Sequence, residues 1–296
     1  MLEADGHEVA LFAVARDDCP CASDLAGFDL VCNHAIQAPP ETIRKIAEQL
    51  PNVQFININH SALAHLERTT PRFVNRFTAS IHSARQLPNV WYASQDPVAR
   101  DVGRATGVER CVWIPTPGHE LKPRPYREPA ERPVVVIAGR ADAIKNNLVQ
   151  LIACALVRDQ IRLVLCMEPD LAIRNTLHAL QYQPDVMGLL DHGQWLDFLR
   201  TTADVVLCCS LAESYGFVAA EAMQTGVPVV ASNAIKFAHR ELTIDANTPQ
   251  TIAYRISFAI DNHRRMATEC AALASGEAAF QVAEYLRQIN RIGRKA

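Results

Sequence analysis

Short apolar runs that alternate with predicted helices constrain the fold of this chain more than any other feature of its sequence. The runs span residues 7–15, 28–35, 52–60, 89–94 and 108–115 in the first series, and 134–139, 161–167, 203–209 and 227–232 in the second. Helices are predicted over residues 39–50, 95–107, 146–157, 169–181 and 217–225. Short runs rich in Val, Ile and Leu are typical of parallel strands buried on both faces. The sequence therefore predicts an α/β protein with helices on both faces of parallel sheets.

A proline-rich segment separates the two series of strands. Residues 116–133 contain five prolines and many charges, and their apolar residues follow no helical or strand period. This composition is typical of a linker. We therefore expect two doubly wound, Rossmann-like domains, of residues 1–120 and 134–278, joined by a linker of residues 121–133. A final amphipathic helix with a basic end is predicted over residues 279–296.

The bulk composition restricts the class of protein and of partner. The net charge of −3 and the isoelectric point near 6.4 give no support for a broad nucleic-acid-binding face. Because no apolar run is long enough to span a membrane, we predict no transmembrane segment. The N-terminus has no basic segment before its apolar stretch, so we predict no signal peptide. The nine cysteines lack zinc-binding spacing, and we interpret them as reduced thiols of a cytoplasmic protein.

The segment SLAESYGFVAAEAMQTGVPVVAS, residues 210–232, places two carboxylates across the start of a predicted helix. Glu213 lies in the loop that follows the strand 203–209, and Glu221 lies about one turn into the helix. Ligands of open α/β sheets bind beyond the carboxyl ends of the strands, which is where this loop lies. Both carboxylates can therefore face the same crevice.

The chemistry of this segment fits a nucleotide sugar. The backbone N–H groups from about Tyr215 to Val218 lie at the positive end of the predicted helix, which suits a diphosphate. Gly216 lets the backbone approach such a ligand closely. The Glu221 carboxylate can accept two hydrogen bonds from a ribose diol, and Glu213 can hold the hydroxyls of a sugar. The alternative interpretation is that each glutamate is a solvated surface acid.

Two cations follow the first strand of the second series. That strand ends at Gly139, and Arg140 and Lys145 lie in the loop beyond it. A guanidinium can hold phosphate oxygens as a fork, and an ammonium adds a point charge. The loop can therefore bind phosphate, and a solvated surface pair is the alternative interpretation of this spacing taken alone.

Together these motifs resemble a known family. The string ESYGFVAAEAMQTGVPVVAS is similar to the E-x7-E signature of retaining glycosyltransferases with two Rossmann domains, the GT-B type, and in particular to the large glycosyltransferase family 4 (group 1). Ser214, Tyr215 and Phe217 stand where that family usually has Gly, Phe and Leu. The segment IAGRADAIKNN resembles the G-R-x-x-x-x-K-G opening of the second domain, with Asn146 where glycine is usual.

The resemblance implies a metal-independent, retaining glycosyltransferase. Its N-terminal domain would face the acceptor, and its C-terminal domain would bind a nucleotide-diphosphate sugar, a UDP- or GDP-sugar, with the backbone of residues 187–189 near the base. It implies no cofactor and no metal site, since no Asp-x-Asp motif is evident. It implies catalytic roles for Arg140, Lys145, Glu213 and the strand-end residue His60. It implies donor binding by Gly139, Met187, Gly188, Leu189, Ser214, Tyr215, Gly216, Phe217, Val218 and Glu221.

The start of the chain departs from the family pattern. The segment MLEADGHEV is similar to the end of the family's first helix, so the usual first strand and glycine-rich loop are missing. A parallel sheet without a central strand would leave backbone groups unpaired and apolar faces bare. We therefore expect the remaining strands to close up, or a partner protein or a second copy of the chain (a homo-oligomer) to cover the first domain.

Three alternative functions stay open at this stage. A nucleotide-sugar epimerase or a phosphorylase uses the same fold. A degenerate, non-catalytic nucleotide-sugar-binding or partner subunit would explain the shortened first domain. Third, the acceptor can be a modified nucleic-acid base rather than a glycan, a lipid or a small molecule. The sequence specifies neither the acceptor nor the donor sugar, and it does not decide whether the basic tail RIGRKA docks on a membrane.

Overall fold

The structure is a computed structural model, and it describes residues 8–10, 19–34, 36, 38–60, 71–116, 118, 120–244 and 247–294. The chain divides into two units, each built around one parallel β-sheet. Unit 1 comprises Met1–Pro117 together with Phe280–Ala296, and unit 2 comprises Gly118–Ala279. The two parallel sheets with their helices confirm the predicted fold class. The strand expected over residues 7–15 lies almost entirely outside the described residues.

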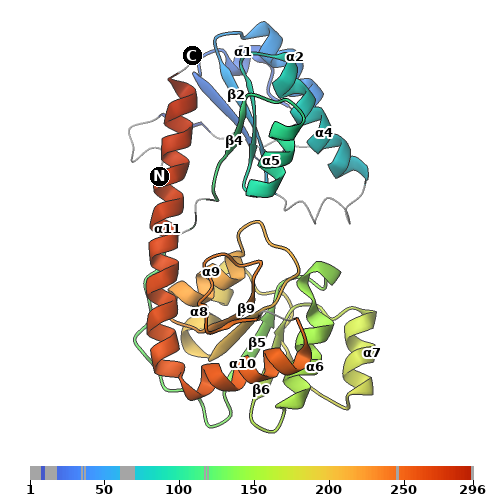
Figure 1. Ribbon diagram of the computed structural model, residues 1–296, viewed down its shortest axis with the longest axis vertical. Helices are drawn as coiled ribbons and strands as arrows, with labels where there is room; N and C mark the ends of the chain where they lie inside the picture. Colours follow the sequence, from blue (N-terminus) through green and yellow to red (C-terminus); the bar gives the residue numbers. More distant parts are fainter. Residues whose placement is uncertain are drawn as a thin grey trace. The chain divides into compact units, whose positions relative to one another are not determined.

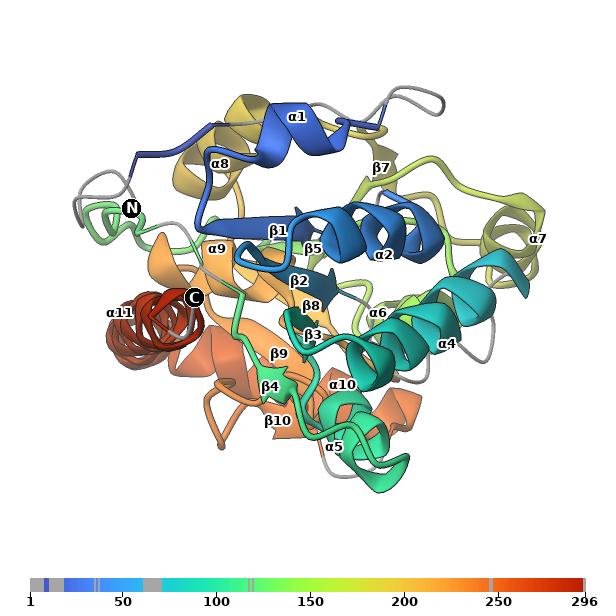
Figure 2. The same ribbon diagram turned by 90° about the horizontal axis from the view of Figure 1, so that it is seen from above.

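Within its described residues, unit 1 contains four parallel strands, which match the predicted runs from 28–35 onward (Figure 1). Its elements are α1 (Ala22–Leu25), β1 (Leu30–His34), α2 (Pro40–Gln49), β2 (Gln54–Asn59), α4 (Pro71–Gln86), β3 (Val90–Ser94), α5 (Pro97–Ala105) and β4 (Cys111–Trp113). Figure 2 shows the strands side by side in the order β1-β2-β3-β4. Each strand therefore pairs with its neighbour in the sequence.

One face of this sheet packs against α2 and α4. Successive side chains of a strand point to opposite faces, so Phe55 of β2 and Tyr92 of β3 share this side. They form one cluster with Ile43 of α2 and Ile81 of α4. Fully burying side chains of this size stabilises the fold by about 1.5–3 kcal/mol each.

The other face of the sheet packs against the end of the C-terminal helix, α11 (His263–Gly293). Tyr285, Ile289 and Ile292 form one apolar stripe on this helix and contact Ile56 and Ile58 of β2. All five side chains are at most 4% exposed. The chain itself therefore covers this face of the sheet in unit 1.

Helix α11 is a single helix of 31 residues, which begins well before the predicted start at residue 279. No proline interrupts the sequence between residues 263 and 293, and Gly276 is accommodated within the helix. The helix starts in unit 2 and ends in unit 1. None of the helices in the described ranges combines the length and the apolar character that a membrane span needs.

The described part of unit 2 contains six parallel strands, whose order reverses in the middle of the sheet. Its elements are β5 (Val134–Ala138), η2 (Ala143–Lys145), α6 (Asn147–Leu156), β6 (Arg162–Cys166), α7 (Leu171–Ala179), β7 (Asp185–Val186), α8 (His192–Thr201), β8 (Val205–Cys208), α9 (Phe217–Gln224), β9 (Val229–Ser232), β10 (Thr243–Ile244), α10 (Pro249–Asp261) and the start of α11. The strand order is β10-β9-β8-β5-β6-β7. The chain therefore extends the sheet in one direction from β5 and in the opposite direction from β8.

The proline-rich segment, predicted as a linker over residues 121–133, is part of unit 2. Arg124 donates hydrogen bonds to the carbonyl groups of Leu199 at 2.8 Å and Ala203 at 3.1 Å. Arg127 pairs with Asp204, whose side chain is fully buried. The arginines of this segment thus donate hydrogen bonds to carbonyl groups at the end of α8, which have no acceptor role within the helix, and are not simply hydrated.

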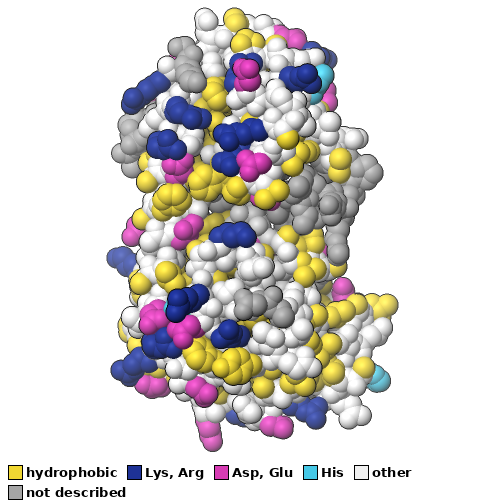
Figure 3. Space-filling view, in the orientation of Figure 1, with side chains coloured by type: hydrophobic (Ala, Val, Ile, Leu, Met, Phe, Trp, Pro, Cys, Tyr) yellow, Lys and Arg dark blue, Asp and Glu magenta, His cyan; other side chains and the backbone are white. Residues whose placement is uncertain are grey.

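Helices α5 and α11 and strand β4 line a hollow of about 420 Å³ on unit 1. Four arginines line it, Arg100 and Arg104 from α5 and Arg287 and Arg291 from α11. Figure 3 shows Lys and Arg side chains gathered over this part of unit 1. The rest of the face in view carries interspersed basic and acidic side chains, as the small net charge suggests.

Candidate functional site

The predicted motifs of the second domain meet where the strand order of unit 2 reverses. Strands β5 and β8 are hydrogen-bonded neighbours, so the segments that follow their carboxyl ends lie next to each other. The backbone N–H of Leu211 donates to the Ile144 carbonyl at 2.7 Å, and Asn146 Nδ2 donates to the Cys209 carbonyl at 3.3 Å. In doubly wound folds this reversal is the usual position of a ligand.

Lys145 and Glu213 form an ion pair at this position. Lys145 Nζ contacts Glu213 Oε1, and Ser210 Oγ donates to the same oxygen at 2.7 Å. The Glu213 side chain is only 7% exposed, and that of Lys145 is 22% exposed. Within the described ranges no residue donates to Glu213 Oε2. That oxygen can therefore accept a hydrogen bond from a ligand hydroxyl.

Glu221 lies one turn inside α9 and is oriented by two side chains of α8. Its Oε1 contacts His192 Nε2 at 3.0 Å, and its Oε2 accepts a hydrogen bond from Trp195 Nε1 at 2.8 Å. A carboxylate oxygen has two lone pairs, so one on each oxygen remains for the two hydroxyls of a diol. The ribose-binding role of Glu221 stays a prediction, and in this geometry it depends on His192 and Trp195.

Helix α9 begins directly after Gly216, which has a φ of 95°. A Cβ at this position would overlap Ile235 Cδ1, so the left-handed turn requires glycine here. The first N–H groups of a helix have no intrahelical acceptor, and together with the helix dipole they attract an anion. The predicted residues Phe217 and Val218 provide these groups.

The side chain of Tyr215 packs inside unit 2. Its ring lies 5.2 Å from the ring of Phe217 and 5.1 Å from that of Phe237, measured between centroids. Burial raises the pKa of Tyr215 to about 12, and its hydroxyl has no hydrogen-bond partner within the described part of the chain. Tyr215 and the half-buried Ser214 can therefore take part in donor binding mainly through their backbone.

Arg140 stands apart from the ion pair. Its side chain is 74% exposed, and Nη2 lies 3.7 Å from Asp142 Oδ2. Among the described residues no hydrogen bond or ion pair joins the Arg140 side chain to the other predicted site residues. Gly139, with a φ of 115°, turns the chain after β5. Asn146 has a φ of 57°, a conformation that asparagine tolerates, which explains how it replaces the usual glycine.

The predicted base-binding segment follows the edge strand β7. The Met187 N–H donates to the Leu165 carbonyl at 2.9 Å and is therefore used within unit 2. The side chains of Met187 and Leu189 are 47% and 64% exposed, and Gly188 between them has a φ of 71°. The segment leads into α8, the helix that carries the two partners of Glu221. Its position near a base stays a prediction.

His60 lies in unit 1, at the end of β2, beside a second histidine. His60 Nε2 lies 3.3 Å from Nδ1 of His34 at the end of β1, and the Tyr285 hydroxyl lies 3.4 Å from His34 Nε2. Burial, and to a smaller extent His34, lowers the pKa of His60 to about 4. The ring is therefore neutral at pH 7 and can donate one hydrogen bond and accept another. Its catalytic role stays a prediction.

Four of the residues in these groups lie outside the sequence motifs that predict the site. Ser210 is the residue directly before the loop, and no sequence signal gives its hydrogen bond to Glu213. His192 and Trp195 are three residues apart, a spacing that places them on one helix face. His34 ends a predicted strand as His60 does, and this shared position is the signal that could have found it.

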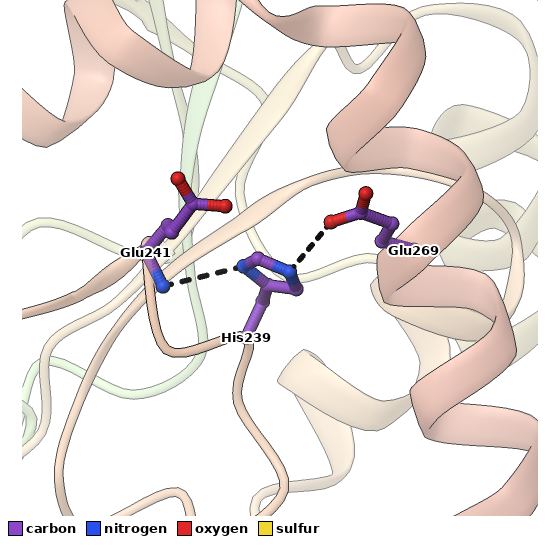
Figure 4. Close-up of side chains that lie close together, drawn as sticks. All are labelled: His239, Glu241 and Glu269. Atoms are coloured by element: carbon purple, nitrogen blue, oxygen red, sulfur yellow. Dashed lines mark hydrogen bonds and ion pairs between the residues drawn. The ribbon is translucent and has the colours of Figure 1, made fainter.

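A separate group in unit 2 contains His239, Glu241 and Glu269, whose ligand atoms all lie within 4.8 Å of one another (Figure 4). His239 Nε2 contacts Glu269 Oε2 at 2.8 Å, and His239 Nδ1 accepts from the Glu241 backbone N–H at 3.3 Å. Arg265 Nη1 lies 2.6 Å from Glu241 Oε2 and 3.5 Å from Glu269 Oε2. Because the guanidinium already supplies the positive charge between the two carboxylates, we interpret this group as an ion-pair network.

Comparison with protein families matches residues 119–271 to the glycosyl transferases group 1 model. The match covers more than half of the chain and contains both predicted motifs, with the Lys145–Glu213 ion pair and Glu221. Comparison with curated protein sequences finds no match.

Solved structures show the same fold at low sequence identity. HepE from Anabaena, in complex with UDP and glucose, is 16% identical with a TM-score of 0.71, over 92% of this chain and 79% of that chain. Sucrose-phosphate synthase from Thermosynechococcus elongatus is 19% identical with a TM-score of 0.66, over 90% and 74%. A glycosyltransferase from Rickettsia africae is 11% identical with a TM-score of 0.64, over 99% and 86%. The shared fold is the GT-B fold, which consists of two Rossmann-like domains.

Proposed function

Because the chain belongs to the group 1 glycosyl transferases, we propose that it transfers a sugar from a nucleotide-diphosphate sugar to an acceptor hydroxyl. We further propose that the transfer needs no metal ion and retains the configuration of the anomeric carbon. HepE of Anabaena has been solved with UDP-glucose, which makes UDP-glucose the first donor to test and a GDP-sugar the second. The proposed acceptor is a hydroxyl group of a glycan, a lipid or a small molecule.

The ion pair of Lys145 with Glu213 is the observation that carries this proposal. It combines a cation and a carboxylate with one unused oxygen, at the point where the strand order of unit 2 reverses. A diphosphate needs the cation, and a sugar hydroxyl needs the carboxylate oxygen. The ammonium has three donors, of which Glu213 takes one, so two remain for phosphate oxygens.

In the proposed reaction the diphosphate lies at the start of α9. The helix N–H groups, Lys145 and Arg140 stabilise the negative charge that develops on it. The bond between the anomeric carbon and the diphosphate oxygen breaks, and the acceptor oxygen bonds to that carbon on the same face. The acceptor proton passes to the leaving phosphate oxygen. Glu213 holds the donor sugar, and Glu221 holds the ribose.

Calorimetry with UDP, GDP and ADP, followed by measurement of UDP release from UDP-glucose, tests the proposal. We expect one nucleotide to bind and its sugar derivative to be hydrolysed slowly without acceptor. Arg140→Ala and Glu213→Gln should each lower this release by about tenfold or more, because each removes a contact to the reacting group. Arg174→Ala is the control, since Arg174 is an exposed arginine of α7 in the same unit.

Each outcome of this experiment separates one alternative. Binding of a nucleotide without turnover of any donor would identify the chain as a non-catalytic nucleotide-sugar-binding subunit. Normal turnover in both variants would contradict the assigned roles. Failure of all three nucleotides to bind would contradict the proposal as a whole.

A further inference from the structure

The arginine-lined hollow of unit 1 presents guanidinium groups from two helices. Arg100 and Arg104 lie one turn apart on α5, and Arg287 and Arg291 lie one turn apart on α11. Residues four apart share one face of a helix. Both helices therefore direct two arginines toward the same hollow, and none of these residues belongs to the proposed donor site.

Two of the four guanidinium groups have no carboxylate partner among the residues that the structure describes. Arg100 pairs with Asp101 at 2.9 Å, and Arg287 pairs with Glu284 at 2.6 Å. Arg104 and Arg291 form no ion pair with any carboxylate in the part of the chain that the structure describes. The hollow therefore carries about two uncompensated positive charges, which match the charge of a phosphate monoester near pH 7.

One of the residues that line the hollow has a buried polar atom that lacks a partner among the described residues. Gln288 is 6% exposed and lines the hollow from α11. Its Nε2 donates to Glu284 Oε1 at 2.7 Å, whereas its Oε1 accepts no hydrogen bond within the described residues. A phosphate oxygen cannot satisfy this carbonyl, because both are acceptors, but a hydroxyl group can. A ligand that satisfies this carbonyl as well as the arginines therefore carries a hydroxyl in addition to its anionic group.

Two aromatic rings add an apolar surface. Trp113 at the end of β4 and Phe280 of α11 are stacked, with ring centroids 6.3 Å apart and planes inclined by 29°. Phe280 is 52% exposed although it lies in this lining. Exposed aromatic faces beside polar groups are typical of sites that bind one flat, partly apolar face of a ligand.

From this combination we propose that the hollow of unit 1 binds a hydroxylated phosphate monoester. Arg104 and Arg291 hold the phosphate, Gln288 Oε1 accepts a hydrogen bond from a hydroxyl, and the ring face of the ligand lies on Trp113 and Phe280. A sugar phosphate in solution and a lipid with a phosphate-monoester headgroup share part of this chemistry. The site does not depend on the proposed transferase reaction, because it uses residues of unit 1 alone.

Calorimetry of the full chain with glucose 6-phosphate, inorganic phosphate and glucose tests the proposal. We expect glucose 6-phosphate to bind at least about tenfold more tightly than the other two, because only it makes both kinds of contact. The double variant Arg104→Gln/Arg291→Gln should lose about tenfold or more of this affinity. Lys45→Gln/Arg85→Gln makes the same charge change at two exposed positions of unit 1 and should leave the affinity unchanged.

A third variant separates the hydroxyl contact from general charge attraction. Gln288→Leu should weaken glucose 6-phosphate while leaving inorganic phosphate unaffected, because phosphate does not use the carbonyl. Far-UV circular dichroism and thermal unfolding check that each variant is folded. Arg104 and Arg291 are exposed, so their replacement does not remove core side chains.

Vesicle sedimentation identifies the source of the ligand. The lipid probe is phosphatidylinositol 4-phosphate in phosphatidylcholine vesicles, because its headgroup carries both a phosphate monoester and ring hydroxyls. A lipid headgroup would be identified if these vesicles bind the chain, if glucose 6-phosphate releases it, and if the arginine double variant does not bind. Binding of glucose 6-phosphate without vesicle binding would identify a free metabolite. The proposal is overturned if neither probe binds, or if the arginine double variant binds as the wild type does. Equal competition by an oligonucleotide that lacks terminal phosphates would also overturn it, since such a ligand has only phosphodiesters.

Discussion

Replacement of Lys145 by methionine should destabilise unit 2, because it leaves the Glu213 carboxylate buried without its cation. Methionine keeps most of the aliphatic volume of lysine, so the change removes the charge with little loss of packing. After the change Ser210 is the only described residue that still donates a hydrogen bond to Glu213. We therefore expect the lost charge pairing to dominate the effect.

The burial of the Lys145–Glu213 ion pair determines how much stability the change removes. Breaking a fully buried ion pair costs about 3–5 kcal/mol, whereas an exposed pair contributes only about 0–1 kcal/mol. Glu213 is 7% exposed and Lys145 is 22% exposed, so the pair is nearer to the buried limit. We expect Lys145→Met to lower the free energy of unfolding by about 2–4 kcal/mol. In the double variant with Glu213→Gln neither charge remains, so the loss should be smaller than the sum of the two single losses by about 1 kcal/mol or more.

Urea unfolding combined with hydrogen exchange measures this cycle without any need for substrate. Exchange of the backbone amides of β8, which lies in unit 2, reports the stability of that unit separately from unit 1. Losses that add within about 0.5 kcal/mol would mean that the two charges do not interact. That result would refute the buried ion pair and the donor site built on it.

Three further predictions concern the turn at α9, the histidine of unit 1 and the role of metal ions. Gly216→Ala should destabilise unit 2 by about 1–3 kcal/mol, because it forces a strained φ and a clash with Ile235. Gly276→Ala within α11 should instead stabilise the chain by about 0.5–1 kcal/mol. Thermal unfolding in which the Gly276 variant is the less stable of the two would contradict this prediction. The pKa of the His60 ring is lowered from 6.5 to about 4 in the folded chain. Between these two pH values the unfolded chain binds a proton that the folded chain does not bind. The free energy of unfolding therefore falls as the pH falls through this range. His60→Gln should recover about 1 kcal/mol of the loss between pH 7 and pH 5, allowing for partial exposure of the ring, and equal pH dependence of the variant and the wild type in urea unfolding would oppose this. Donor turnover in EDTA should stay within about twofold of its value in buffer, since side-chain cations stabilise the leaving diphosphate. A loss of turnover in EDTA that Mg²⁺ restores would show that the reaction needs a metal ion.

The sequence predicts the sheet of unit 2 well because the residues of its central strands form continuous apolar runs. Val134–Ala138 and Val205–Cys208 are apolar at every position, as strands buried on both faces require. Because both are parallel strands of a doubly wound sheet, the loops that follow their carboxyl ends must lie at the same edge of that sheet. The meeting of Lys145 with Glu213 therefore follows from the pattern of strands together with the two motifs.

Contacts that depend on helix packing are not predictable in this way. Trp195 and His192 reach Glu221 only because α8 packs beside α9, and neither helix pattern specifies its neighbour. Arg124 illustrates a second limit of prediction from sequence. A charged, proline-rich segment has the composition of a solvated linker, whether its arginine is hydrated or donates hydrogen bonds to the carbonyl groups at the end of a helix. Composition gives the charge of such a segment and not its partner.

The long helix α11 has a consequence for the order in which the chain acquires its structure. The residues that close one face of the sheet in unit 1 come from Phe280–Ala296, although the strands they cover end at Trp113. On a ribosome the strands of unit 1 emerge before unit 2, yet Ile56 and Ile58 stay without their covering side chains until residues 285–292 are made. Unit 2 is contiguous in the sequence and can complete its core earlier. Of the two units, the one whose strands are translated earlier is therefore the one that completes its core later, and a chaperone that shields apolar surface during translation would act mainly on unit 1.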